Sequence, residues 1–304
     1  MNMFAKRGVI IGTLTLAALL VVGVSVFFRW NSGQQQPDSA RKLRVVATIY
    51  PLADFAKQIG GDALEVRTVV PAGVEPHDYE PTPQDVVDLY RADVVLVNGN
   101  GVDPWADKLV DDLRKQGVRT VRMSEEIASI GSSDPHFWLD PVLAKQAVEM
   151  IGRPLKSLRV PVPVEEGVRT VQAKLVALDE RYSRGLAECQ RREFVTTHDA
   201  FSYLAKRYQL VQHPISGFSP TEDPSPQTMA EITNLVTQKG ITTVFTESLV
   251  SPKTAQTIAT ETGAQTAVLN PIEGITEEEQ RAGKDYLQLM EENLVHLRAA
   301  LECS

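Results

Sequence analysis

Short β-branched strands alternate with amphipathic stretches along the sequence from Leu43 onward. Helix starts are marked by Thr82-Pro83 and Ser225-Pro226, where a capping residue precedes a proline at the first helical position. Alternation of this kind gives parallel sheets with helices on both faces. The sequence therefore predicts an α/β fold with mostly parallel sheets. The expected strands cover residues 43–48, 64–70, 93–98, 119–123, 193–197, 241–246 and 266–270.

Two segments of the chain are similar to each other. Residues 80–85 (EPTPQD) and 223–228 (DPSPQT) each lead into an amphipathic stretch and then into a strand. A duplicated α/β lobe explains this similarity, and chance similarity between two capped helices is the alternative. We therefore predict two similar β/α lobes, formed by residues 42–160 and residues 191–304.

One long helix is predicted between the lobes. Apolar residues recur at intervals of three or four from Val164 to Cys189, which is typical of a helix with one buried face. About 25 residues at ~1.5 Å each span roughly 37 Å. Residues 161–190 are therefore expected to form a linking helix that joins the lobes as a stiff strut.

The first 30 residues differ in composition from the rest of the chain. Lys6 and Arg7 precede an uncharged run of 21 residues, Gly8–Phe28. This run exceeds the ~7–15 residues of a signal-peptide core and reaches the ~18 that are needed to cross a bilayer. We expect residues 1–30 to form a membrane anchor with its basic end inside, and a cleaved signal segment is the alternative. The polar residues 31–41 are expected to form a flexible tether.

Both alternatives place the rest of the chain outside the cytoplasm, in the periplasm or at the outer face of the cytoplasmic membrane. Residues 1–41 hold four of the 31 basic residues and one of the 39 acidic residues, so the remainder has a net charge of −11. An acidic protein of this kind disfavours nucleic acid and is compatible with a bound cation. We therefore expect no nucleic-acid partner.

The chain has two cysteines, Cys189 and Cys303. An even count in an exported chain favours one disulfide, and two buried free thiols are the alternative. The C-terminal segment has helical periodicity and is expected to begin at a capping box formed by Thr276 and Glu279. The disulfide would then pin this C-terminal helix to the end of the linking helix.

Three of the five histidines follow expected strands. His77 and His136 lie beyond strand ends in the first lobe, and His198 comes directly after a strand in the second lobe. Ligands of open α/β sheets bind beyond the carboxyl ends of the strands. Glu247 and the turn that ends at Glu273 occupy equivalent positions in the second lobe, so we expect a crevice between the lobes lined by imidazoles and carboxylates. The other two, His213 in a loop-like Gln-His-Pro and His296 on the C-terminal helix, are expected outside this site.

Imidazole is a ligand for zinc and its transition-metal neighbours, whereas magnesium and calcium prefer oxygen ligands. Three histidines and one carboxylate complete a closed tetrahedral zinc site. Acidic neighbours are candidates to orient the ligating rings from behind. These neighbours are Asp78, Asp134, Asp140 and Asp199.

Two rival functions use the same residues. An exported zinc hydrolase would hold the ion with three histidines and leave one position open for water. The sequence has no His-Glu-x-x-His or Gly-x-Ser-x-Gly motif and no phosphate-binding glycine loop, so we expect binding without catalysis. A receptor for a metal chelate is the second rival, and it would need a larger crevice lined by aromatic residues.

Several motifs resemble those of the cluster A-I metal-binding proteins of ABC importers. They are VVATIYPL at 45–52, PHDYEPTP at 76–83, DPHFWLDP at 134–141, TTHDAF at 196–201 and VLNPIEG at 268–274. The resemblance implies two α/β lobes joined by one long helix, a metal held between them and delivery to a membrane permease. It also implies that His77, His136 and His198 are the first three ligands. A histidine at the third position resembles the zinc members rather than the manganese members.

The fourth ligand departs from the most common pattern of that family. Many relatives have a ligating aspartate where this chain has Asn270, whereas some zinc-type relatives use the glutamate of a similar turn, which corresponds to Glu273. We expect Glu273 to complete the site, with Asn270 and Glu247 as alternatives. The chain is thus expected to be an extracytoplasmic, high-affinity zinc-binding protein that delivers Zn²⁺ to an ABC importer permease. A receptor for manganese or another divalent metal is the alternative.

Overall fold

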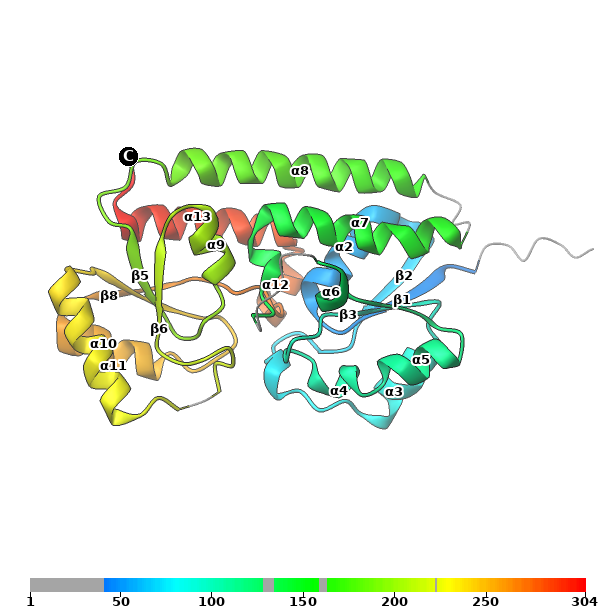
Figure 1. The fold of residues 1–304 in the computed structure, drawn as a ribbon, viewed down its shortest axis with the longest axis horizontal. Helices are drawn as coiled ribbons and strands as arrows, with labels where there is room; N and C mark the ends of the chain where they lie inside the picture. The colour runs from blue at the N-terminus through cyan, green and yellow to red at the C-terminus, as the bar shows by residue number, and fades with distance from the viewer. Residues whose placement is uncertain (1–40, 128–133, 159–162, 222) are drawn as a thin grey trace, which may run out of the picture. The chain divides into compact units, whose positions relative to one another are not determined.

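The computed structural model describes residues 41–127, 134–158, 163–221 and 223–304. The membrane anchor or signal expected at residues 1–30, and residues 31–40 of the expected tether, lie outside this part of the chain. Within the described ranges, no helix is both long enough and apolar enough to cross a membrane. Residues 42–304 form a single unit, and Figure 1 shows how its helices and strands are arranged.

The N-terminal lobe is built on a parallel sheet with the strand order β2-β1-β3-β4. Its strands are β1 (Leu43–Ala47), β2 (Leu64–Thr68), β3 (Val94–Val97) and β4 (Arg119–Arg122). Strand β3 is buried along its whole length, as expected for a central strand that is covered on both faces. Val94 and Leu96 pack with α2 (Tyr50–Gly60) and α7 (Pro141–Ser157). Val95 and Val97 pack on the opposite face. The helices of that face are α3 (Pro83–Tyr90), α4 (Pro104–Asp107) and α5 (Val110–Lys115), and the short α6 (Met123–Glu126) follows β4.

The C-terminal lobe repeats this topology with the strand order β6-β5-β7-β8. Its strands are β5 (Glu193–Thr196), β6 (Val211–Pro214), β7 (Thr243–Thr246) and β8 (Gln265–Val268). Its helices are α9 (Ser202–Arg207), α10 (Pro226–Lys239), α11 (Lys253–Thr262), α12 (Glu277–Arg281) and α13 (Tyr286–Leu301). Each sheet places its first strand between its second and third. The prediction of two similar lobes with parallel sheets is therefore confirmed.

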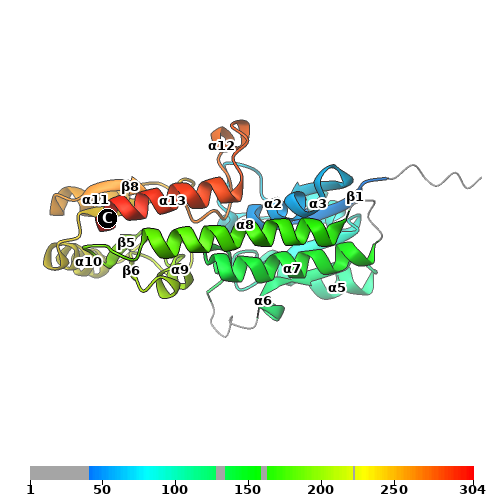
Figure 2. The ribbon, with the colours of Figure 1, turned by 90° about the horizontal axis from the view of Figure 1, so that it is seen from above.

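Helix α8 (Val164–Gly185) is the long helix between the lobes. Its 22 residues span about 33 Å, and it packs on α2 and α7 of the first lobe and on α13 of the second. Figure 2 shows it running alongside α7 and α13. Its approach to α2 depends on Gly167, because a Cβ atom there would lie 2.1 Å from the carbonyl oxygen of Ile59. The predicted linking helix is confirmed, and the residue limits of the lobes stay a prediction.

The end of the chain is fastened to the end of α8 as expected. Cys189 and Cys303 form a disulfide. The prediction of one continuous C-terminal helix from Thr276 is wrong, because the capping box of Thr276 and Glu279 opens the short α12 instead. Gly283 then adopts a left-handed conformation with φ of 69°. A second capping box begins α13 at Asp285.

Strand β6 is absent from the predicted set. His213, expected in a loop, lies in this strand and contacts the Glu193 carboxylate through Nε2, at 2.8 Å. Pro214 is the last residue of the strand, and proline makes this segment unlike a typical strand sequence. Proline is tolerated here because β6 is at the edge of the sheet, where not every backbone N–H group is needed for pairing.

Candidate metal site

His77 lies in a short 3₁₀ helix, Pro76–Asp78, that follows β2. Proline at the first position of this turn fixes its φ angle. The Glu75 side chain caps the turn by accepting a hydrogen bond from the His77 backbone N–H at 3.2 Å. The imidazole points inward, with its side chain 4% exposed.

His136 lies just before the 3₁₀ helix Phe137–Leu139 and is completely buried. Asp134 Oδ1 lies 2.9 Å from both its backbone nitrogen and its ring Nδ1. Because a carboxylate accepts a hydrogen bond, the proton of the neutral ring resides on Nδ1, and the Nε2 lone pair faces the site. Of the four acidic neighbours suggested by the sequence, Asp134 is thus the one that orients a histidine of this cluster through a direct contact.

His198 follows β5 and is also completely buried. Its backbone carbonyl accepts hydrogen bonds from the side chains of Thr196 and Gln212, at 2.8 and 2.9 Å. Its Nδ1 lies 2.7 Å from the carboxylate of Glu247, which directly follows β7. Glu247 therefore fixes the tautomer of His198 from behind and does not face the cluster itself.

Glu273 is presented by the turn that follows β8, and its side chain is 1% exposed. Asn270 builds this turn, because its Oδ1 accepts a hydrogen bond from the Ile272 backbone N–H at 2.8 Å. The Asn270 amide also donates to Glu279 at 3.2 Å. With both ends of its side chain in use, Asn270 shapes the turn and does not enter the cluster.

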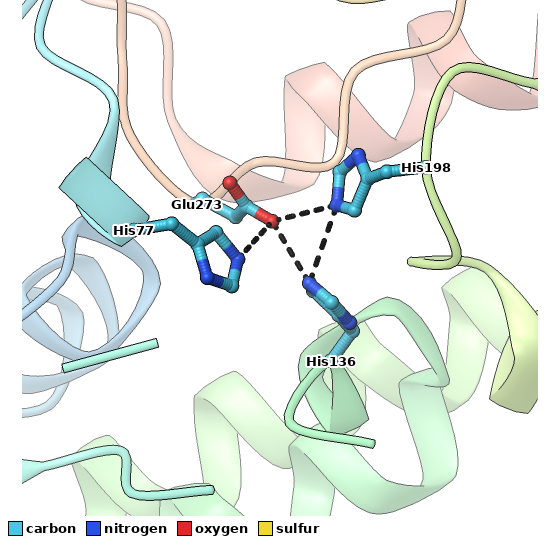
Figure 3. A group of neighbouring side chains, drawn as sticks. All are labelled: His77, His136, His198 and Glu273. Atoms are coloured by element: carbon cyan, nitrogen blue, oxygen red, sulfur yellow. Dashed lines mark hydrogen bonds and ion pairs between the residues drawn. The ribbon is translucent and has the colours of Figure 1, made fainter. Parts of the chain in front are cut away.

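The four side chains His77, His136, His198 and Glu273 converge on one point, as Figure 3 shows. One donor atom from each lies within 4.8 Å of the others. Glu273 Oε1 is 3.4 Å from His77 Nε2, 2.9 Å from His136 Nε2 and 3.1 Å from His198 Nε2. The two Nε2 atoms of His136 and His198 are 3.4 Å apart.

These four separations fit four of the six edges of a zinc tetrahedron. With ligands about 2.0–2.1 Å from the ion, neighbouring ligand atoms lie about 3.3 Å apart. Two buried polar atoms of the cluster, His77 Nε2 and Glu273 Oε2, have no hydrogen-bond partner within the described residues. Buried polar atoms without partners are costly. A divalent ion at this point would satisfy the lone pairs that face one another.

The cluster is strongly polarised by its own charges. Burial opposes protonation of His136, but its hydrogen bonds to Asp134 and Glu273 outweigh this effect and raise its pKa. Burial likewise opposes protonation of His198, whose pKa is nevertheless held well above its usual value by the carboxylates of Glu247 and Glu273. The opposite balance lowers the pKa of Glu273 well below its usual range, since the histidines outweigh its burial. In the metal-free protein, protons on the histidines therefore balance the negative charge of the carboxylates, as a metal cation would.

Glu75 is a further acidic residue of the site that the sequence did not single out. Burial and the adjacent Glu273 carboxylate raise the pKa of Glu75 to about 9. Near neutral pH its carboxyl group therefore carries a proton and adds no charge to the cluster. In the sequence, only its position two residues before His77 points to a role in the site. Its contact with Glu273 cannot be read from the sequence, because this contact depends on the packing of the two lobes.

His213 and His296 lie outside the cluster, as expected. His213 pairs with Glu193, and His296 contacts the backbone carbonyl of Val268 through Nδ1, at 2.6 Å. Among the remaining acidic neighbours, Asp140 pairs with Arg207 in the C-terminal lobe.

The sequence matches the model of the family "Zinc-uptake complex component A periplasmic" (ZnuA) over residues 45–300. It is 36% identical over 304 residues to the zinc-binding lipoprotein AdcA of Streptococcus pneumoniae. This alignment covers 93% of this chain and 60% of that protein. The chain thus spans less than two thirds of this relative. It is also 34% identical to the high-affinity zinc uptake system protein ZnuA of Bacillus subtilis, over 86% of this chain and 88% of that protein.

A solved structure agrees with these relationships. The Zn(II)-bound ZnuA-like domain of Streptococcus pneumoniae AdcA superposes with a TM-score of 0.76 and 37% identity, over 86% of this chain and all of that domain. Family match, identity and fold all extend over both lobes and the helix between them. The chain therefore belongs to the zinc-uptake complex component A (ZnuA) family.

Proposed function

We propose that this protein is an extracytoplasmic zinc receptor that binds one Zn²⁺ and delivers it to the permease of an ABC importer. The observation that carries the proposal is the convergence of three imidazole Nε2 atoms and one carboxylate oxygen within 4.8 Å. In this proposal His77, His136, His198 and Glu273 ligate the ion, and zinc is the cargo. The relatives named as zinc-binding and zinc-uptake proteins support the same conclusion.

The donor set favours zinc over manganese. Three nitrogen donors suit zinc, whereas manganese is better served by carboxylate and carbonyl oxygens. A full set of four protein donors also favours binding over catalysis, since a catalytic zinc site keeps one position for water or substrate. We therefore favour reversible coordination over metal-assisted hydrolysis. A chelate receptor is disfavoured because the donor atoms are too close together to enclose an organic ligand.

Delivery to a permease and a location outside the cytoplasm are proposed on two grounds. The family is described as a periplasmic zinc-uptake component. The uncharged run at Gly8–Phe28 is long enough to cross a bilayer as an anchor, and a cleaved export signal is the alternative. Either form of this segment would leave the metal site on the outer side of the cytoplasmic membrane.

The decisive experiment measures zinc in protein purified without added metal, followed by a competition titration with a zinc chelator. We expect one zinc per chain, and His136→Ala should weaken zinc binding by about 100-fold or more, since loss of an outer-shell partner alone costs about 10–100-fold. His213→Ala is the matched control, because His213 also pairs with a carboxylate but lies outside the cluster. Wild-type affinity in His136→Ala, or manganese bound in preference to zinc, would reject the proposal.

A further inference from the structure

The segment 134–140 contacts the C-terminal half of the chain at every second residue. The Trp138 indole donates a hydrogen bond to the backbone carbonyl of Pro271 at 2.8 Å, in the turn that carries Glu273. The residues that make these contacts are Asp134, His136, Trp138 and Asp140. This segment is therefore one seam between the two lobes, in addition to the backbone hydrogen bonds of Tyr50 with Glu273 and of Gly73 with Ile275.

Helix α9 contacts the 3₁₀ helix Phe137–Leu139 in the middle of the seam, and Figure 1 shows it beside the start of α7. Tyr203 donates a hydrogen bond from its hydroxyl to the Asp134 carbonyl at 3.3 Å. One helical turn later, Arg207 Nε donates to both oxygens of the Asp140 carboxylate, to Oδ1 at 3.1 Å and to Oδ2 at 2.9 Å, and Arg207 Nη2 forms an ion pair with Oδ2 at 2.8 Å. Because residues four apart share a face of a helix, one face of α9 contacts both ends of the seam.

The ion pair between Arg207 and Asp140 is rigid on its acidic side. Asp140 is buried, and its Oδ1 caps α7 by accepting a hydrogen bond from the Val142 N–H at 2.8 Å. Charged contacts from two nitrogens of one guanidinium to a single carboxylate restrain direction as well as distance. The side chain of Arg207 is 37% exposed, so the importance of the pair lies in geometry rather than in bulk stability.

This ion pair connects the two backbone segments that carry facing histidines. Asp140 comes four residues after His136, and Arg207 is at the end of the helix that begins four residues after His198. The Nε2 atoms of the two histidines are 3.4 Å apart, which is the spacing that a tetrahedral ion requires. A fixed distance between Asp140 and Arg207 therefore limits the distance between the two rings.

We propose that Arg207 is a positioning residue of the metal site, which holds His136 and His198 at zinc-binding distance through its hydrogen-bonded ion pair with Asp140. This inference rests on the proposed function. Without the pair, the two lobes sample wider separations at the seam, and binding must first bring the rings together. Zinc then dissociates faster, because an opening at the seam breaks two of its four bonds at once.

The test compares zinc dissociation rates and affinities of Arg207→Met, Arg207→Lys, Asp140→Asn and the Asp140→Asn/Arg207→Met double variant. Arg207→Met should bind zinc about tenfold more weakly, mostly through faster dissociation. Lysine keeps the charge but offers one nitrogen instead of the two that contact Asp140, so this variant should be intermediate. Asparagine at position 140 still caps α7. The double variant should be no weaker than the weaker single variant. Arg114→Met is the matched control, because Arg114 pairs with Glu125 inside the first lobe at 2.9 Å and is 39% exposed.

A second readout separates positioning from a general structural role. If Arg207 positions the site, zinc should raise the melting temperature of Arg207→Met less than that of the wild type, because binding and closure are linked. A purely structural role would lower the melting temperature of Arg207→Met equally with and without zinc, and would leave its zinc affinity within twofold of that of Arg114→Met. This result would overturn the inference. If Arg207→Met does not fold, Arg207→Lys and Asp140→Asn decide by the same criteria. Wild-type protein that binds no zinc would instead reject the proposed function.

Discussion

At the scale of single residues, the cluster depends on carboxylates that do not face its centre. Asp134 and Glu247 each hold the Nδ1 side of one imidazole, at 2.9 and 2.7 Å. Each thereby leaves an Nε2 lone pair available to a metal and makes that nitrogen a stronger donor. Asn270 acts one step further out, because it shapes the turn that presents Glu273.

Glu273 and Asn270 should differ sharply on replacement by alanine. Glu273→Ala removes the negative donor at the centre and should weaken zinc binding by about 100-fold or more. Asn270→Ala loosens the turn but leaves the carboxylate in place, so we expect a loss of about tenfold at most. A chelator competition titration measures both. A large loss at Asn270 with little change at Glu273 would reverse the two roles.

The identity of the fourth donor shows where prediction from sequence stops. The three histidines were predicted because each follows a strand, which is a local feature of the sequence. The choice among Glu247, Asn270 and Glu273 was not local, since all three follow strands of the same lobe. Which of the three side chains faces the histidines depends on the partners that each finds in the folded chain, such as Glu279 for the amide of Asn270. Glu75 was missed for the same reason.

At the scale of elements, long periodic segments were predicted well and short ones were not. The one-faced pattern of α8 was visible because six buried positions repeat over its 22 residues. Strand β6 is four residues long, contains a histidine and ends in proline, so its backbone pairing outweighs a weak local preference. The break between α12 and α13 depends on the left-handed Gly283, which helical periodicity alone does not reveal.

The contact between α8 and α2 gives a prediction at this scale. Gly167→Ala places a methyl group 2.1 Å from the Ile59 carbonyl oxygen, which is backbone and cannot move aside. Overpacking costs about 1–3 kcal/mol, and the rigid neighbour places this clash at the upper end. The better helix propensity of alanine returns only about 1 kcal/mol. Gly167→Ala should therefore lower the free energy of unfolding by about 1–2 kcal/mol in urea titrations.

Gly185→Ala in the same helix is the control for this substitution. Its nearest neighbours would be side-chain atoms rather than backbone, namely Cδ of the flexible Arg298 at 3.1 Å and Cδ1 of Leu294 at 3.3 Å. We expect this variant to be as stable as the wild type or slightly more stable. If Gly167→Ala proved equally stable, α8 would not be held against α2 in the way described.

At the scale of the whole molecule, the site exists only where both lobes meet. His77 and His136 come from the first lobe, and His198 and Glu273 from the second. The strut α8, the disulfide and the seam at residues 134–140 all restrict relative motion of the lobes. A metal site built in this way gains affinity from pre-organisation, because the protein scaffold determines the spacing of the donor atoms.

The same arrangement makes the proposed zinc binding depend on pH. Without metal, Asp134 and Glu273 raise the pKa of His136 against the effect of burial, and Glu247 and Glu273 raise that of His198 further. The metal-free fold therefore holds these protons more tightly than the unfolded chain, and this stabilisation is lost as pH rises through the raised pKa values. Zinc must displace the same protons. As pH falls, zinc affinity should therefore begin to decline while the pH is still above ~6.5, the pKa of an ordinary histidine. Below the raised pKa values, the loss can reach about tenfold per pH unit for each titrating ring.

The measurement is a competition titration across pH 5–9 with a chelator of known proton linkage, together with melting temperatures with and without zinc. Zinc affinity should collapse as pH falls, and the melting-temperature rise caused by zinc should shrink in parallel, since the protonated metal-free form gains stability while the complex loses it. An all-carboxylate site would keep its metal until about pH 4, near the ordinary pKa of Asp and Glu. Retention of zinc down to such acidity, or release of a single proton per zinc near neutral pH, would mean that His136 and His198 do not ligate together. Because buried carboxylates raise the pKa values of both histidines, the loss of zinc affinity should begin above about pH 6.5. The rise in melting temperature caused by zinc should begin to shrink at the same pH.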